Sequence, residues 1–191
     1  KQQKYILIMA LNIEQNECRK KILDFLNSKE CYFGLYGSAG TGKSHTISHT
    51  LKDYNQKVLF LGATNKVVSV LKSSLENSGF INPKVKTIDS FLKFKIEKDE
   101  FNNSTISYTF PSIKDIPELL VIDEVSMITN QKFQLIQRLK NYCKIILIGD
   151  YLQLPPIEED KDTVVRNSDG FLVSKIFTVV KPENTYTLTI Q

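Results

Sequence analysis

The sequence predicts an α/β domain in which a mostly parallel sheet is flanked by helices. The first observation is a set of four short apolar runs, whose near-continuous hydrophobicity is typical of strands buried on both faces of a parallel sheet. These runs are CYFGLY (31–36), KVLFLGA (57–63), LLVI (119–122) and KIILIG (144–149). The second observation is that stretches with helical spacing separate the runs, and this alternation favours one layered domain with right-handed crossovers.

The composition fits a single domain, or one domain with a small appendage. The chain has 191 residues, of which 41% are hydrophobic, so it can bury a core without disulfides or a structural metal. Its formal net charge of +4 is compatible with a polyanionic partner. The thiols of Cys18, Cys31 and Cys143 are odd in number and form no C-x-x-C pair. We therefore expect reduced cysteines and an intracellular protein, of cytoplasm or nucleus.

Three further expectations concern the two ends of the chain and its relation to membranes. Residues 5–11 (YILIMAL) lack a small-residue cleavage site, which favours a buried lead-in over the core of a signal peptide. No apolar run approaches the roughly 20 residues that cross a bilayer, so we expect no membrane partner. The chain begins without Met and ends in the strand-like TLTIQ, and we expect a fragment of a longer protein.

Three helices and one hairpin are expected between the strands. Helical spacing covers residues 44–54, 65–79 and 130–142, and a glycine at the end of the second segment is a typical helix stop. Residues 93–110 break the alternation, because charged alternation is followed by the turn-prone Asn102-Asn103-Ser104 and then by ISYTF. This pattern predicts a small inserted β-hairpin, for which an ordinary surface hairpin is a sufficient account.

A phosphate-binding loop follows the first strand. GSAGTGKS fits the pattern G-x-x-x-x-G-K-[ST], and ligands of open parallel sheets bind at the carboxyl ends of the strands. Glycines let backbone amides face phosphates, and the next helix adds positive potential at its N-terminus. We expect Lys43 to reach the β and γ phosphates of a nucleoside triphosphate and Ser44 to ligate Mg²⁺. The expected nucleotide-binding residues of the loop are Gly37, Ser38, Ala39, Gly40, Thr41, Gly42, Lys43 and Ser44.

Polar residues also follow the third and fourth strands. Asp123 ends the third strand, where a carboxylate is expected to hold Mg²⁺. The adjacent Glu124 can polarise an attacking water, which indicates hydrolysis; the alternative is a solvated pair of acids or a helix cap. Asp150 and Gln153 follow the fourth strand in GDYLQLPP, and we expect both at the edge where the γ-phosphate and magnesium lie, with Asp150 as a nucleotide-binding residue. Gln153 can bond the γ-phosphate or the attacking water and lose that partner on hydrolysis.

Five motifs together resemble those of superfamily 1 helicases. The motifs are GSAGTGKS, LGATNKVVSVL, TIDSFL, LLVIDEVSM and ILIGDYLQLPP, and the DEVSM and GDYLQLPP forms are most similar to the RecD/Pif/Dda branch. The resemblance implies a RecA-like P-loop NTPase motor domain (1A) over residues 1–92 and 111–191. It implies that the hairpin at 93–110 is a wedge or pin (1B), and that a second motor domain with arginine fingers follows residue 191.

The same resemblance implies the ligands. It implies ATP with Mg²⁺ as the cofactors, single-stranded DNA or a single-strand/duplex junction as the track, and 5′–3′ translocation in the full-length DNA helicase. Replication or repair proteins are possible further partners. Because arginine fingers supply roughly 10³–10⁵ in rate, we expect the chain alone to bind nucleotide, to hydrolyse it poorly and not to unwind. A nucleotide-switch module without unwinding activity and a small-substrate kinase are the alternatives.

Residues outside the phosphate loop are assigned in the same way. LNIEQ is similar to the family's adenine-reading motif, with Gln15 as reader, although Asn12 and Gln15 also have the spacing of a helix capping box. Asp89 stands where relatives often carry His, and since an acid would repel a phosphate we expect it to point away. The residues expected to contact the phosphates of DNA are Thr64, Asn65, Lys66, Thr87 and Ser90.

Four aromatic residues of the hairpin segment leave two interpretations open. Phe94, Phe101, Tyr108 and Phe110 could stack on DNA bases. They could equally pack the hairpin onto the main domain, and we expect this second role for most of them.

Overall fold

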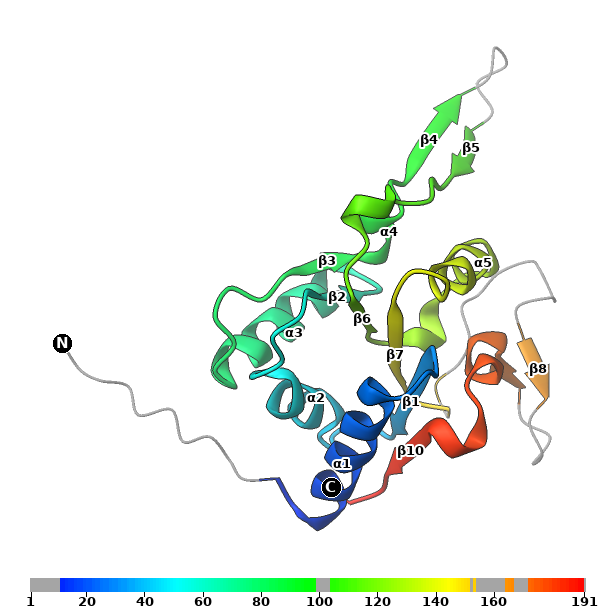
Figure 1. Cartoon of the computed structure of the whole chain (residues 1–191). Helices are drawn as coiled ribbons and strands as arrows, with labels where there is room; N and C mark the ends of the chain where they lie inside the picture. Colours follow the sequence, from blue (N-terminus) through cyan, green and yellow to red (C-terminus); the bar gives the residue numbers. More distant parts are fainter. Residues whose placement is uncertain (1–10, 99–103, 152, 154–163, 167–171, 191) are drawn as a thin grey trace.

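A parallel sheet forms the centre of the molecule in the computed structural model, which describes residues 11–98, 104–151, 153, 164–166 and 172–190. The sheet has six strands in the order β10-β1-β7-β6-β2-β3 (Figure 1). Its strands are β1 (Tyr32–Gly37), β2 (Val58–Gly62), β3 (Val85–Thr87), β6 (Leu119–Ile122), β7 (Lys144–Gly149) and β10 (Thr185–Leu188). Every pairing within this sheet is parallel. The predicted fold class and all four predicted strands are confirmed.

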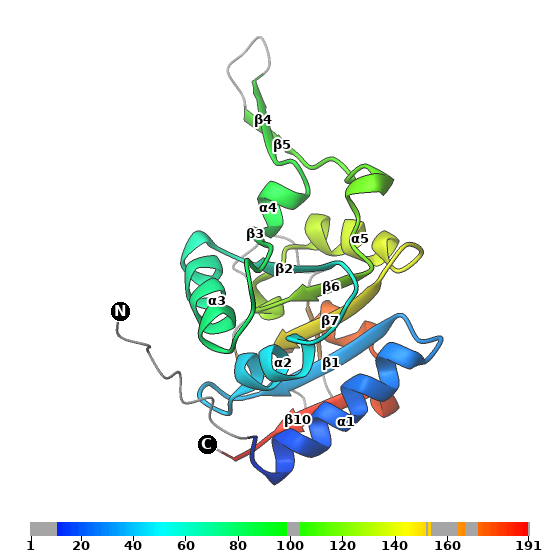
Figure 2. The same cartoon turned by 60° about the vertical axis from the view of Figure 1, so that its left-hand side comes forward.

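Helices cover both faces of this sheet (Figure 2). The helices are α1 (Ile13–Asn27), α2 (Lys43–Leu51), α3 (Asn65–Asn77), α4 (Ile88–Phe91) and α5 (Asn130–Leu139). The first three pack their buried residues on one face, and α4 and α5 pack on the other. The helices predicted over 44–54, 65–79 and 130–142 correspond to α2, α3 and α5 and are confirmed.

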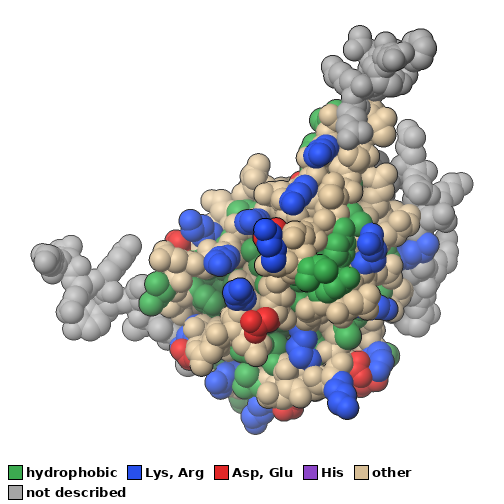
Figure 3. Space-filling model, turned by 45° about the horizontal axis from the view of Figure 1, so that its top comes forward, with side chains coloured by type: hydrophobic (Ala, Val, Ile, Leu, Met, Phe, Trp, Pro, Cys, Tyr) green, Lys and Arg blue, Asp and Glu red, His purple; other side chains and the backbone are tan. Residues whose placement is uncertain are grey.

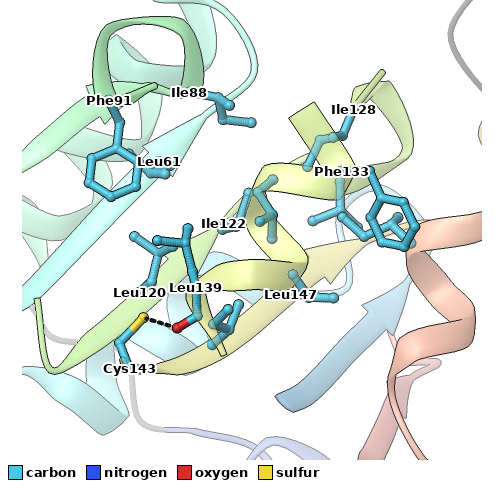
Figure 4. Packing of buried hydrophobic residues seen from close by; sticks show 14 of the residues in the cluster. Leu61, Ile88, Phe91, Leu120, Ile122, Ile128, Phe133, Leu139, Cys143 and Leu147 are labelled. Atoms are coloured by element: carbon cyan, nitrogen blue, oxygen red, sulfur yellow. Dashed lines mark hydrogen bonds between the residues drawn. The ribbon is translucent and has the colours of Figure 1, made fainter. Parts of the chain in front are cut away.

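Two apolar cores lie on opposite sides of the sheet because successive residues of a strand point to opposite faces. In β1, Leu35 packs with α1, α2 and α3, whereas Tyr36 packs with α4 and α5. Figure 4 shows the second core, in which Ile122 and Leu147 from the sheet meet Phe133 of α5. Burial of each aliphatic or aromatic side chain stabilises the fold by about 1.5–3 kcal/mol. The apolar runs therefore favour a sheet that is covered on both faces.

Short 3₁₀ turns complete the second face and the connections. They are η1 (Ile113–Asp115), η2 (Val125–Met127), η4 (Lys175–Val179) and η5 (Pro182–Asn184). Buried residues of η2 and η4 join the core that α4 and α5 form. The turn η2 directly follows the acidic pair after β6, so this packing also fixes the backbone that carries the pair.

The inserted hairpin consists of β4 (Lys95–Lys98) and β5 (Ser104–Ser107), which pair antiparallel and project from the body of the domain (Figure 1). The hairpin is thus confirmed within residues 93–110. One detail of the prediction is wrong: Ser104 begins β5 instead of lying in the turn, because its backbone pairs with Lys98. Asn102 and Asn103 lie outside the described residues. A second antiparallel pair, β8 (Val164–Arg166) with β9 (Leu172–Ser174), was not predicted.

The two ends of the described chain meet beside β1. β10 pairs with β1 in the register Gly34 to Thr185; it ends at Leu188, so the strand expected in TLTIQ is confirmed for its first two residues, and Thr189 and Ile190 lie after the strand. The carboxylate of Glu14 in the first turn of α1 accepts hydrogen bonds from the backbone N–H groups of Thr189 (2.9 Å) and Ile190 (3.0 Å). The predicted lead-in at 5–11 lies outside the described residues except for Leu11. No helix in the described ranges is long and apolar enough to span a membrane.

Candidate nucleotide site and nucleic-acid interface

The loop between β1 and α2 has a backbone that only glycine accommodates at two positions. Gly37 has a φ of 147°, and a Cβ there would lie 2.4 Å from the carbonyl oxygen of Leu188. Gly42 has a φ of 82°, and a Cβ there would lie 2.4 Å from Nε2 of Gln15. At Gly37 a side chain would meet the backbone of β10, whereas at Gly42 the Gln15 side chain could move aside but the left-handed backbone itself favours glycine. Close packing thus explains the first glycine of the phosphate-loop pattern, and backbone conformation explains the second.

Lys43 closes over this loop. Its Nζ donates to the carbonyl oxygens of Gly37 (2.7 Å) and Ser38 (2.9 Å), and the hydroxyl of Thr41 also donates to Ser38 (2.9 Å). An ammonium group has three donors and can exchange carbonyl oxygens for phosphate oxygens without a change of backbone. The lysine therefore lies where the sequence predicted it, at the mouth of the loop.

Asp123 lies opposite, at the end of β6. It is 9% exposed, and one carboxylate oxygen accepts from the backbone N–H of Glu124 (2.9 Å). Burial and the neighbouring Glu124 charge raise the pKa of Asp123 to about 6, while Lys43 and a hydrogen bond with Ser44 oppose the rise. The structure thus brings Lys43, Ser44 and Asp123 together, as the sequence predicted from separate strand ends.

Glu124 has a backbone conformation that is unusual for its residue type. Its φ is 55°, in the left-handed region, and such strain persists where the surrounding structure requires it. Glu124 and Asp123 line a cavity of about 330 Å³ together with Ser44 and Lys66. The expected metal ligands Ser44 and Asp123 and the expected general base Glu124 therefore share one cavity with Lys66, which the motif resemblance assigns to DNA.

Asp150 and Gln153 follow β7 at the same carboxyl edge of the sheet. Asp150 is 9% exposed, and its backbone carbonyl accepts from the N–H of Gln153 (3.2 Å). The side-chain oxygen of Gln153 accepts from the hydroxyl of Ser126 in η2 (2.8 Å). Because Ser126 is 1% exposed, this bond fixes the amide of Gln153 relative to the acidic pair. Ser126 lies within the DEVSM motif, where nothing in the spacing predicts this contact.

Gln15 takes part in the capping box and also contacts the phosphate loop. Its side-chain oxygen accepts from the N–H of Asn12 (3.1 Å), and its own N–H donates to the side chain of Asn12 (2.8 Å). Its Nε2 then donates to the carbonyl of Thr41 (3.5 Å). The alternative left open by the sequence, a capping box, is therefore formed, and the adenine-reading role stays a prediction.

The residues expected to contact DNA lie at the starts of α3 and α4. The hydroxyl oxygen of Thr64 accepts from the N–H of Val67 (3.3 Å), and that of Thr87 accepts from the N–H of Ser90 (3.1 Å). Each threonine is thus an N-cap whose hydroxyl hydrogen can still be donated to a phosphate. The side chains of Thr64, Asn65, Lys66 and Ser90 are exposed and that of Thr87 is half-buried.

Asp89 forms an ion pair with α5. Its carboxylate lies 2.7 Å from the Nζ of Lys132, which agrees with the expectation that it faces away from a phosphate track. The same lysine lies over the ring of Tyr108, 5.5 Å from its centroid. The base of the hairpin is therefore connected to α4 and α5.

Most of the described hairpin aromatics pack inward. Tyr108 and Phe110 contact the core formed with α4 and α5, and the guanidinium of Arg138 lies 4.7 Å from the ring centroid of Phe110. Phe94 packs against Tyr108 at 5.6 Å between centroids but stays 40% exposed. Phe101 lies outside the described residues. Packing onto the domain therefore accounts for two of these rings, and Phe94 is the one described ring of the four with a large free surface.

A family model described as an AAA domain matches residues 20–159. The chain belongs to this AAA domain family. Among curated relatives, it is 32% identical over 167 residues to an uncharacterized protein of Acanthamoeba polyphaga mimivirus, covering 78% of this chain and 34% of that protein. It is 29% identical over 155 residues to the ATP-dependent DNA helicase Pif1 of Campylobacter jejuni, covering 75% and 33%. The chain spans about a third of the length of both relatives.

Solved structures of Pif1 helicases share the fold. A structure of two coordinating Pif1 helicases at forked dsDNA matches with a TM-score of 0.65 and 19% identity, over 96% of this chain and 45% of that one. Bacteroides Pif1 bound to ssDNA matches with a TM-score of 0.59 and 19% identity, over 95% and 42%. The AAA domain of this chain is thus RecA-like and similar to the motor domain of Pif1 helicases, which confirms the resemblance drawn from the five motifs.

Proposed function

We propose that this chain is the first motor domain of an ATP-dependent DNA helicase that binds ATP with Mg²⁺ and single-stranded DNA. The carrying observation is the shared cavity, in which Ser44, Asp123 and Glu124 meet Lys66 of the motif assigned to DNA. A hydrolytic site and a polyanion-binding side chain that line one cavity can affect each other directly. That arrangement supports coupling of nucleotide turnover to movement on a strand.

The residues of the site fit a magnesium ion. Mg²⁺ prefers oxygen ligands and retains several waters, and here a buried carboxylate and a hydroxyl meet at the mouth of the phosphate loop. Asp123 and Ser44 would hold the ion, and the bound ion would neutralise charge on the β and γ phosphates. The raised pKa of Asp123 supports this assignment, because a buried carboxylate next to Glu124 is stabilised by a cation.

Four side chains of this chain would bind the nucleotide and assist its hydrolysis. Lys43 would bind the β and γ phosphates, and Glu124 would accept a proton from the water whose oxygen attacks the γ-phosphorus. The bond from that phosphorus to ADP breaks as the new P–O bond forms. Gln153, held by Ser126, would bond the γ-phosphate and lose that partner when phosphate leaves. Gln15 would read the adenine from the start of α1.

The finer parts of the proposal concern the whole protein. We propose 5′–3′ translocation, arginine fingers supplied by a second motor domain, the hairpin at 93–110 as a duplex-splitting wedge, and an intracellular location with replication or repair proteins as partners. The motif resemblance supports the direction, the similarity to Pif1 helicases at forked dsDNA supports the wedge, the greater length of the relatives supports a second domain, and the unpaired cysteines support the location. The chain of 191 residues alone should then bind nucleotide, hydrolyse it slowly and fail to unwind.

The deciding experiment is ATP turnover by the longest natural form of the protein that contains this chain, with and without oligo-dT. We expect strong stimulation by the single strand. An equal rate of ATP turnover with and without oligo-dT would contradict the helicase assignment. Robust unwinding by the chain of 191 residues would remove the requirement for a second motor domain.

A non-enzymatic nucleotide switch is the second candidate, and Glu124 distinguishes it. Because general-base catalysis contributes about 10²–10⁴ in rate, Glu124→Gln should lower turnover by that factor in the longer form and leave ATP binding intact. Glu183→Gln, the same change at an exposed acid of η5, is the matched control and should leave turnover unchanged. Equal turnover of both variants would favour the switch.

A further inference from the structure

A basic furrow of about 380 Å³ lies beside the amino ends of β2, β3 and β6. Its lysines, which define what we call the lysine furrow, are Lys57, Lys84, Lys86, Lys93 and Lys114. All five side chains are exposed, and none forms an ion pair with a described residue. Asp115 is the single acidic residue in the described lining. Five ammonium groups against one carboxylate make this a strongly positive surface.

The furrow is separate from the nucleotide site. The phosphate loop and the acidic pair lie at the carboxyl ends of the strands, whereas Lys57 and Lys84 directly precede β2 and β3. The whole chain has 25 basic and 21 acidic residues, so five lysines in one furrow are a marked concentration. Lys and Arg side chains gather on the surface below the projecting hairpin (Figure 3). A surface of one charge sign raises the local concentration of an oppositely charged partner.

The furrow touches both the expected DNA contact and the hairpin. Ser90 lines it, and so do Lys93 and Pro111, which bound the hairpin segment on either side. A ligand in the furrow would therefore lie at the base of the hairpin. Its phosphates would continue from the strand that Ser90 is expected to contact.

The described lining of the furrow offers charged groups for phosphates and no exposed aromatic ring. Grooves for single strands combine positive charge with exposed aromatic rings on which bases stack. In the lysine furrow the aromatic residue is Phe91, which is 5% exposed and packed in the core. A furrow with ammonium groups and without a free ring suits a ligand whose bases are already paired, since only the phosphates are offered.

We propose that the lysine furrow binds the phosphodiester backbone of duplex DNA at the base of the hairpin, ahead of the single-strand track. The proposal rests on the helicase function proposed above and extends it to a second DNA surface. Phosphate contacts of lysine are independent of sequence, which suits a motor that must engage any duplex.

The test uses fluorescence anisotropy of the whole chain with a short blunt-ended DNA duplex and with oligo-dT, over a series of NaCl concentrations. Lys57→Gln/Lys114→Gln removes one charge from each of two sides of the furrow. Lys20→Gln/Lys29→Gln removes the same charge from exposed positions on and after α1 and is the control. Thermal melting of both variants checks that the fold is retained.

We expect the duplex affinity of the furrow variant to fall about tenfold at low salt. The slope of log K against log salt should become less steep by about 2, because each lost phosphate contact reduces its magnitude by about 0.9. The control variant should bind duplex like the unsubstituted chain. Oligo-dT affinity should change far less than duplex affinity in the furrow variant.

Three results would overturn the proposal. An equal loss of duplex affinity in both variants would assign the effect to net charge. An equal loss of affinity for oligo-dT and for duplex would make the furrow part of the single-strand track. Unchanged duplex affinity in the furrow variant would show that the furrow does not bind duplex. If the unsubstituted chain binds duplex but oligo-dT neither binds nor stimulates ATP turnover in the longer form, the helicase assignment fails while the furrow stands.

Discussion

The surroundings of Asp123 disfavour the ionised form of its carboxylate. Burial and the charge of Glu124 raise its pKa from 3.8 to about 6. Between these values the folded state binds more protons than the unfolded state, so this residue lowers stability as pH rises through the window from about 4 to 6. Each pKa unit corresponds to about 1.4 kcal/mol, so the ionised form destabilises the ligand-free fold by roughly 3 kcal/mol at pH 7.

Replacing Asp123 by Asn should therefore stabilise the ligand-free chain. Asn keeps an oxygen that can accept from the N–H of Glu124, and it cannot ionise. We expect Asp123→Asn to raise the melting temperature at pH 7.5 and the difference from the unsubstituted chain to shrink toward pH 4. A difference that stays the same at both pH values would show that the carboxylate is not the cause. Binding of ATP with Mg²⁺ should weaken in the same variant.

The two roles of Gln15 can be separated by one atom. Glu at this position keeps the oxygen that accepts from the N–H of Asn12, but it loses the Nε2 that contacts Thr41. We expect Gln15→Glu to retain the stability of α1 while losing any preference of the chain for ATP over GTP. Gln15→Ala should lose the preference and also about 1 kcal/mol of stability, because the hydrogen bond from the N–H of Asn12 is lost while Asn12 still caps the helix. If both variants keep the preference, Gln15 serves only as a cap.

At the scale of elements, the hydrogen bond between Ser126 and Gln153 joins η2 to the segment after β7. Ser126→Ala would leave the amide of Gln153 without this donor. Since a hydrogen bond contributes about 1 ± 0.5 kcal/mol, we expect kcat of DNA-stimulated ATP turnover in the longer form to fall roughly fivefold.

A split between kinetic constants tests that positioning role. KM for ATP should stay within about twofold, because Ser126 would act through Gln153 and not on the ground-state nucleotide. Ser73→Ala, at an exposed position of α3, is the control. A rise in KM with unchanged kcat would contradict the positioning role and indicate a local packing defect.

The elements differ in how much of them the sequence predicts. The four strands β1, β2, β6 and β7 were predicted because each is a continuous apolar run that is buried on both faces. β3 was missed because its three residues, Val85–Thr87, are half-buried or exposed and form no such run. β8 and β9 are also three residues each, and so short a segment carries no recognisable period.

The same difference holds within the site. Lys43, Ser44, Asp123 and Glu124 were predicted because strand ends of a parallel sheet meet at one edge. The bond from Ser126 to Gln153 links residues on two elements, so nothing in the spacing indicates it. The lysine furrow combines residues from five separate positions between Lys57 and Lys114, and only the folded chain brings them together.

At the scale of the whole molecule, each of the two cores contains one buried cysteine, so thiol reactivity measures the opening of each core separately. Cys18 belongs to the core under α1 and Cys143 to the core under α5, and burial raises the pKa of each thiol to about 12. Near neutral pH both are almost fully protonated and enclosed, so neither is an effective nucleophile. Cys31 is half-buried.

Thiol labelling of the native chain should therefore proceed in two stages. We expect one fast reaction at Cys31 and slow reactions at Cys18 and Cys143, with both slow rates equal if the two cores open in one cooperative step. Mass spectrometry after timed addition of iodoacetamide measures each rate. Fast labelling of Cys18 or Cys143 would contradict the burial, and unequal slow rates would mean that the two faces of the sheet unfold separately.

The position of β10 has a consequence for the order in which the chain can fold. β1 lies between β7 and β10, and its pairing of Gly34 with Thr185 joins residues about 150 positions apart. On the ribosome the N-terminal segments emerge first, so β1 stays unpaired on one side until β10 has been made. Contacts this distant in sequence form slowly. The strand that carries the phosphate loop is thus enclosed late, and nucleotide binding during synthesis would indicate that β10 has paired with β1.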